Sequence, residues 1–137
     1  MAEARERLVA HLRVTVGENA RLGPGKADLL EAVGQEGSIS AAGRRLGMSY
    51  ARAWRLLSEL EAGFGRPLVR ASRGGGGGGG ARLTPLGAEV LAAYRRMQAQ
   101  AEAAVAAEVE RLRALLAQPA AEEAPAFHEG ETGTPDQ

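Results

Sequence analysis

Residues 37–65 read GSISAAGRRLGMSYARAWRLLSELEAGFG, and they contain the most informative signals for helix starts and ends in the chain. Ser38 or Ser40 is placed to cap a short helix. Gly47 follows that helix and can supply the positive φ of a tight helix stop. Ser49 then caps a second helix. Because two helices joined by a short glycine-containing turn have the spacing of a helix-turn-helix, the stretch predicts this motif.

The apolar residues of this stretch recur at steps of three or four, which places them on one face of each predicted helix. They are Ile39, Ala42 and Leu46 in the first helix, and Ala53, Leu57 and Leu60 in the second, which we predict to end near residue 62. The opposite face of the second helix carries Tyr50, Arg52, Arg55 and Glu59. Tyr50 and Arg52 lie in its first turn, the part of a recognition helix that reaches base edges in the DNA major groove.

The residues before this motif predict a hairpin and one more helix. Residues 12–16 alternate between apolar and polar, and residues 17–19 read GEN, so we predict a small β-hairpin over about 11–22. Pro24 suits the first position of a helix, where a missing N–H costs nothing. With an apolar stripe at Leu29, Leu30 and Val33, it predicts a helix over Pro24–Glu36.

The residues after the motif predict a wing. Residues 66–85 read RPLVRASRGGGGGGGARLTP, two β-prone segments around seven glycines. A phosphate-binding P-loop needs Lys and then Ser or Thr after its glycines, and the chain has Ala81 and Arg82 there. We interpret the glycines as a wing tip, with a passive flexible loop or a linker as alternatives. In a wing, the backbone at Gly76, Gly77 and Gly78 approaches phosphates, and charge comes from Arg70, Arg73 and Arg82.

The chain then predicts a long helix. Thr84 caps it, Pro85 takes its first position, and apolar residues recur every three or four residues to Leu116. A helix of about 32 residues spans about 48 Å, which is longer than this domain can cover. We therefore predict that it pairs with the same helix of a second chain, through Tyr94, Met97, Val105, Val109 and Leu112. The alternative is that its Ala-rich middle, residues 99–107, frays or bends back onto the core.

Charge is unevenly distributed along the 137 residues, although the formal net charge is zero. Residues 1–118 hold all 17 basic but only 12 of the 17 acidic side chains, so they carry +5. Eight arginines and two glutamates lie within residues 44–82. This clustering indicates an anionic partner; the alternative is a solvated arginine-rich face. Residues 119–137 are acidic and rich in Pro and Gly, so we predict a disordered tail after one domain over 1–118.

Composition argues against several other classes of protein. There is no cysteine, and His11 and His128 lie far apart, so we expect no metal centre and no cofactor. No signal peptide or membrane helix is evident, which makes the cytoplasm the expected location and a membrane partner unexpected. Glu59 and Glu61 point to different faces of a helix, and no other pair suggests catalysis, so we do not expect an enzyme.

Several motifs in the same order resemble the N-terminal winged-helix domain of ModE-type molybdate-responsive transcriptional regulators. They are GSIS, LGMSYARAW, GRPLV, the glycine-rich segment and LTPLG, spread over residues 37–87 of a likeness that covers about 12–97. LysR-type DNA-binding domains are similar more distantly. The resemblance implies a mainly α fold with a small β content: a winged helix-turn-helix with an N-terminal hairpin and a long C-terminal dimerisation helix.

The family implies a homodimer on palindromic operators in double-stranded DNA, connected with molybdenum-related genes in a bacterium. We expect no molybdate site in this chain, since no second run of strands follows residue 118. The resemblance assigns Ser49, Tyr50, Arg52 and Arg55 to the major-groove helix. It makes Arg44 and Arg45 candidates for phosphate contacts, with solvation as the alternative.

The position of Trp54 and the kind of partner that the domain binds each allow two interpretations. A helical tryptophan is usually buried, so we expect Trp54 to pack between the recognition helix and the wing or the long helix; stacking at the DNA interface is the alternative. A winged helix is also a scaffold for protein binding, and the acidic tail could mask or replace a DNA-binding face.

Overall fold

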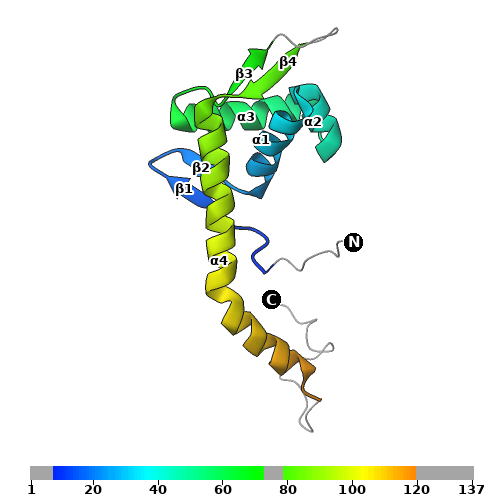
Figure 1. Cartoon of the computed structure of the whole chain (residues 1–137), viewed down its shortest axis with the longest axis vertical. Helices are drawn as coiled ribbons and strands as arrows, with labels where there is room; N and C mark the ends of the chain where they lie inside the picture. The colour runs from blue at the N-terminus through cyan, green and yellow to red at the C-terminus, as the bar shows by residue number, and fades with distance from the viewer. Residues whose placement is uncertain (1–7, 73–78, 120–137) are drawn as a thin grey trace, which may run out of the picture. The chain divides into compact units, whose positions relative to one another are not determined.

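A computed structural model describes residues 8–72 and 79–119 of the chain. In chain order they form β1 (Val14–Val16), β2 (Ala20–Leu22), α1 (Pro24–Glu36), α2 (Ile39–Leu46), α3 (Tyr50–Phe64), β3 (Val69–Ser72), β4 (Gly80–Leu83) and α4 (Pro85–Ala117) (Figure 1). The predicted hairpin, helix-turn-helix, wing strands and long helix are all present. The predicted fold class, mainly α with a small β content, is confirmed.

Local capping sets the limits of the helix-turn-helix. The Ser38 hydroxyl accepts a hydrogen bond from the Ala41 N–H at 2.9 Å, so Ser38 rather than Ser40 caps α2. The Ser49 hydroxyl accepts one from the Arg52 N–H at 3.1 Å and caps α3. Gly47 ends α2 with a φ of 71°, a conformation that glycine adopts without strain.

Helices α1, α2 and α3 pack around one apolar core. Its fully buried members include Leu29, Leu30, Val33, Ala42, Ala53, Leu60 and Leu68. Ile39 and Leu46 are partly buried against it, so both helices of the motif turn their predicted apolar faces inward. Small residues allow this close packing: a Cβ added to Gly43 would lie 3.1 Å from the Met48 carbonyl oxygen.

The wing strands are fixed to the helices at their base. β3 and β4 pair antiparallel, from Val69 opposite Leu83 to Ser72 opposite Gly80. The Glu61 carboxylate, near the end of α3, accepts hydrogen bonds from the N–H groups of Leu68 and Val69 at 2.9 and 3.0 Å. The predicted wing strands are therefore present. Of the tip, Arg73, Gly76, Gly77 and Gly78 lie outside the described residues.

Tyr94 joins the hairpin to α4. β1 and β2 pair antiparallel, with Val14 opposite Leu22. The Tyr94 side chain is fully buried, and its hydroxyl donates a hydrogen bond of 2.6 Å to the Leu12 carbonyl oxygen. The prediction that Tyr94 contacts a second chain is therefore wrong. The reason is that the ring belongs to the buried core of its own chain, with its hydroxyl bonded to the segment just before the hairpin.

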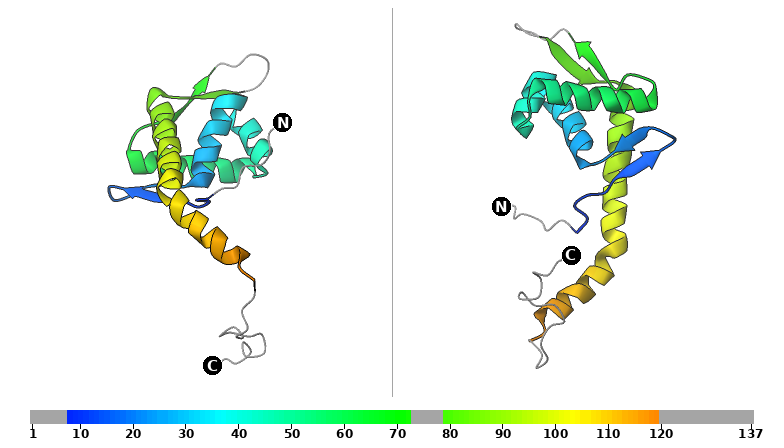
Figure 2. Two further views of the ribbon diagram at one scale, coloured as in Figure 1. Left: turned by 60° about the horizontal axis from the view of Figure 1, so that its bottom comes forward. Right: turned by 180° about the vertical axis from the view of Figure 1, so that it is seen from behind.

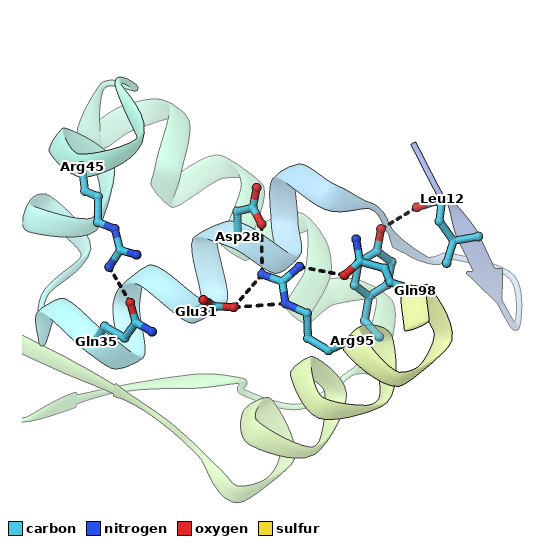
Figure 3. A network of polar contacts seen from close by, with 8 residues as sticks. Leu12, Asp28, Glu31, Gln35, Arg45, Arg95 and Gln98 are labelled. Carbon is cyan, nitrogen blue, oxygen red and sulfur yellow. Dashed lines mark hydrogen bonds and ion pairs between the residues drawn. The ribbon is translucent and has the colours of Figure 1, made fainter. Parts of the chain in front are cut away.

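Arg95 ties the first part of α4 to α1 (Figure 3). Its guanidinium donates to Glu31 at 2.7 Å and to Asp28 at 3.0 Å. Burial alone would lower the pKa of Arg95, but the hydrogen bonds to Asp28 and Glu31 outweigh it, so the pKa lies above its ordinary value. The guanidinium, which is charged at any physiological pH, holds the two helices together through these ion pairs.

The described residues divide into two compact units, the first ending at Ala106 and the second beginning at Ala107. Helix α4 is continuous across the boundary, so its Ala-rich middle is helical. In the second unit Leu112 and Leu116 are 60% and 83% exposed, while Val109 is partly buried. Within the described ranges, no helix is long and apolar enough to cross a membrane.

Candidate nucleic-acid interface

The outer face of α3 carries the residues that helical spacing predicts. Tyr50, Arg52, Arg55 and Glu59 are all exposed, and Ala53, Leu57 and Leu60 are buried beneath them. Arg55 pairs with Glu59 one turn on, at 3.4 Å. Ser49 is exposed too, but its hydroxyl caps the helix. This face can present a guanidinium pair and a phenol to a groove.

The wing side of α3 borders a groove of about 450 Å³ that contains Trp54. Tyr50, Trp54 and Ser58 line it from α3, and Val69 and Ala71 line it from β3. Trp54 therefore lies between α3 and the wing, one of its two expected places, but it is not buried there, since 54% of the residue is exposed. Leu57 and Leu60 already fill the core side of α3, and Trp54 falls about 100° round the helix from Ala53. The exposed part of Trp54 is accessible for a contact with DNA, which is the alternative interpretation.

Two wing arginines face each other without an acidic neighbour between them. Arg70 in β3 lies directly opposite Arg82 in β4. Both side chains are exposed, and neither forms a hydrogen bond or ion pair with any residue in the described ranges. Like charges opposite each other in an antiparallel pair are destabilising. Both guanidinium groups are therefore available to an external anion.

Arg44 and Arg45 differ in their surroundings. Arg45 donates to the Gln35 side chain at 2.6 Å (Figure 3). It also forms an ion pair with Glu36 at 3.1 Å, and both partners lie at the end of α1. Arg44 is exposed and has no such partner among the described residues. Of the two candidates for a phosphate contact, Arg44 is therefore the more available.

The side of α3 away from the wing carries basic residues that the sequence reasoning misses. Arg13 before β1, Arg21 in β2 and Lys26 in α1 line one pocket together with Arg52 of α3. These residues are far apart in sequence, so a local charge count does not find them. No group of His, Cys, Asp and Glu that could hold a metal ion occurs within residues 8–72 and 79–119.

Comparison with known proteins agrees with this geometry. Residues 26–88 match the family model described as "Bacterial regulatory helix-turn-helix protein, lysR family". Over 80 residues the chain is 45% identical to the "Molybdenum-pterin-binding protein MopB" of Rhodobacter capsulatus, covering 58% of this chain and 30% of that one. Over 70 residues it is 44% identical to the "Molybdenum transport protein ModE" of Herbaspirillum seropedicae, covering 51% of this chain and 26% of that one.

The match to solved structures is looser. The crystal structure of the CbnR_DBD–DNA complex is 28% identical with a TM-score of 0.48, covering 67% of this chain and 95% of that one. The chain spans between 26% and 39% of the length of the curated relatives it matches. The sequence matches confirm the resemblance to ModE-type proteins, and more distantly to LysR-type ones, that the motifs indicate.

Proposed function

We propose that the lysR-type helix-turn-helix of residues 26–88 binds duplex DNA and that the chain regulates transcription. It acts as a homodimer on palindromic operators. Two relatives carry molybdenum in their names, one as a transport protein and one as a pterin-binding protein, so we further propose molybdenum-related genes as its targets.

The observation that carries this proposal is the pair of opposed wing arginines. Arg70 and Arg82 repel each other in the free protein, and no described carboxylate relieves that repulsion. A DNA backbone phosphate would relieve it, since guanidinium groups bind phosphate oxygens with two parallel hydrogen bonds. The wing borders α3 through Val69 and Ala71, which line the same groove as Tyr50 and Trp54. Arg70 and Arg82 alternate with these residues and lie on the other face of the wing, where we place the DNA backbone.

Within that surface α3 is the element that reads sequence. Ser49 and Tyr50 begin it, and Arg52 and Arg55 project from its exposed face. Arginine forms two hydrogen bonds with the major-groove edge of guanine, which gives about 1–3 kcal/mol of discrimination against a wrong base. The wing and Arg44 contact phosphates, which position the helix and carry no sequence information themselves.

Dimerisation places two such helices on one operator. Val105, Val109, Leu112 and Leu116 recur at steps of four, three and four along α4, as in the seam of a coiled coil. Met97 contributes from the part of α4 that borders the hairpin, where it is partly buried. A two-fold axis between the chains would present the recognition helices to major grooves about 34 Å apart.

The test first selects, from a pool of random-sequence duplexes, those that the protein binds, and then sequences them. Fluorescence anisotropy then compares the selected duplex with a scrambled one at several salt concentrations. We expect tighter binding of the selected duplex and a steep fall in affinity with salt. The double variant Arg70→Gln/Arg82→Gln should lose affinity for both duplexes by similar factors.

The matched control is the double variant Arg96→Gln/Arg111→Gln, which also removes two positive charges, from exposed positions on α4. It should bind both duplexes nearly as the wild type does. Equal affinity of the wild type for selected and scrambled duplexes contradicts sequence-specific regulation. No binding to any duplex, with or without residues 119–137, contradicts DNA binding and favours a protein partner.

A further inference from the structure

We propose that the pocket on the hairpin side of α3 binds a backbone phosphate of the duplex, on the strand that the wing does not contact. We call it the basic pocket and define it by His11, Arg13, Arg21, Lys26 and Arg52. This inference rests on the proposed function, which assigns α3 to the major groove, and adds a further phosphate contact to those of the wing and Arg44.

The basic pocket has one sign of charge. It is an open cavity of about 510 Å³ between the hairpin, the start of α1 and the side of α3. Its lining includes three arginines, one lysine and a histidine, and no aspartate or glutamate. A concave surface lined by one sign of charge concentrates counter-ions of the opposite sign. The chemistry of the pocket therefore fits an anion with several oxygen acceptors.

Most of these cations lack an internal partner. Lys26 forms an ion pair with Glu59 at 3.5 Å, and its ammonium also approaches the Arg21 carbonyl oxygen at 3.4 Å. For Arg13, Arg21 and Arg52, the described part of the chain offers no side-chain hydrogen bond or ion pair. Three guanidinium groups around one cavity gain nothing from each other, so an external anion is the component that would make the arrangement favourable.

The fold brings these side chains together near the start of α1. Arg13 lies against Gly23: a Cβ added there would meet its Cγ at 3.5 Å and a guanidinium nitrogen at 3.7 Å. Arg21 stands opposite Thr15 in the hairpin. The first turn of α1 contains no acidic residue, and Gly23 offers no side-chain cap, so nothing there offsets the positive sign of the arginines.

The position of the basic pocket relative to α3 identifies which anion it meets. Trp54 and Ser58 line the groove on the wing side of α3, whereas Arg52 and Leu56 line the basic pocket on its other side. Figures 1 and 2 show the same arrangement from three directions, with the β3–β4 wing on one side of α3 and the β1–β2 hairpin on the other. A helix lying in the major groove has a phosphate backbone on each side of it. The wing meets one backbone, and the basic pocket meets the other.

The test uses the full chain and the selected duplex. The double variant Arg13→Gln/Arg21→Gln keeps both side chains long and polar but removes two charges from the pocket. We expect the slope of log affinity against log salt to become shallower by about 0.9 for each phosphate that the variant no longer binds. The control double variant Arg96→Gln/Arg111→Gln removes the same charge from exposed positions on α4 and should keep the wild-type slope. Circular dichroism checks that each variant is folded.

A second measurement shows where the duplex contacts the protein. It also distinguishes a backbone phosphate of the duplex from inorganic phosphate as the anion in the basic pocket. In the wild type, the backbone amide resonances of Gly25 and Lys26 should shift on adding duplex, and a duplex with one neutral methylphosphonate outside the half-site should reduce both shift and affinity. The double variant should be insensitive to that substitution. An unchanged salt slope in the double variant, with normal wild-type binding, overturns this inference alone. So does a pocket whose amides respond to inorganic phosphate but not to the duplex. A wild type that binds no duplex overturns the proposed function instead.

Discussion

The size of the side chain is most restricted at positions where two backbone segments of this chain pack directly against each other. Gly63 lies in the last turn of α3, and a Cβ added there would come within 2.7 Å of the Asn19 carbonyl oxygen and of Ala20 Cα. Gly87 in α4 faces the Leu68 carbonyl group even more closely. Both glycines are therefore required by packing, the first against the hairpin and the second against the residue before the wing.

Gly63→Ala tests this packing. In a helix the substitution usually stabilises by up to about 1 kcal/mol. Here we expect a loss of about 1–3 kcal/mol in the free energy of unfolding, because the hairpin backbone must move to admit the methyl group. Gly25→Ala in α1 is the control, since its added Cβ meets nothing within 4 Å. Urea unfolding of both variants gives the comparison, and a Gly63→Ala protein as stable as the wild type would refute the contact.

The two large aromatic side chains show where sequence reasoning fails at this scale. Periodicity places Tyr94 on an exposed stripe, and general preference places Trp54 in the core. The structure differs from both, with Tyr94 buried in the core of its own chain and Trp54 about half exposed beside the wing. Each outcome depends on an element distant in sequence, and a helical repeat contains no information about which neighbour arrives to cover a face.

At the scale of elements the sequence is more informative, because helix ends are determined locally. The limits of α1, α2 and α4 follow from Pro24, Gly47, Thr84 and Pro85, each of which acts on its own few neighbours. The basic pocket could not be found in this way. It assembles Arg13, Arg21 and Lys26 with Arg52, and only the folding of the hairpin against α3 brings them together.

Thr84 lies between β4 and α4, and its hydrogen bonds connect the start of α4 to the segment before the wing. Its hydroxyl accepts from the Gly87 N–H and donates to the Pro67 carbonyl oxygen, both at 2.9 Å, while its own N–H donates to the Leu68 carbonyl oxygen. Thr84→Val keeps the shape and removes both hydroxyl bonds from a buried site. We expect the free energy of unfolding to fall by about 1–3 kcal/mol.

The same substitution at an exposed strand position gives the control for this prediction. Thr15→Val in β1 should change the free energy of unfolding by no more than about 0.5 kcal/mol. Thermal and urea unfolding, followed by far-UV circular dichroism, measure both variants. If Thr84→Val unfolds like Thr15→Val, the hydroxyl of Thr84 does not hold the wing to α4.

For the whole molecule, the positions of the arginines and of the apolar seam of α4 must both be compatible with two copies of the chain bound to one duplex. Arginines lie on both sides of α3, on the wing as Arg70 and Arg82 and in the basic pocket as Arg13 and Arg21. If the proposed function is right, one such surface would cover one half of a palindromic operator. Binding both halves requires a second copy, held by a contact that leaves these arginines free, and the apolar seam of α4 contains none of them.

Leu112→Glu tests that seam. Leu112 is 60% exposed and lies in register with Val105, Val109 and Leu116, so a carboxylate there would be forced into the apolar contact between two chains. We expect the wild type to sediment at twice the 14.3 kDa chain mass at micromolar concentration and the variant to sediment as a monomer. The variant should also lose roughly 10²–10⁴ in affinity for a palindromic duplex, because the second half-site no longer adds to the first.

Ala114→Glu, about 200° round the helix from Leu112, introduces the same charge outside the seam and should remain dimeric. A wild type that sediments as a monomer, or a Leu112→Glu variant that stays dimeric, would show that the chains associate through another surface.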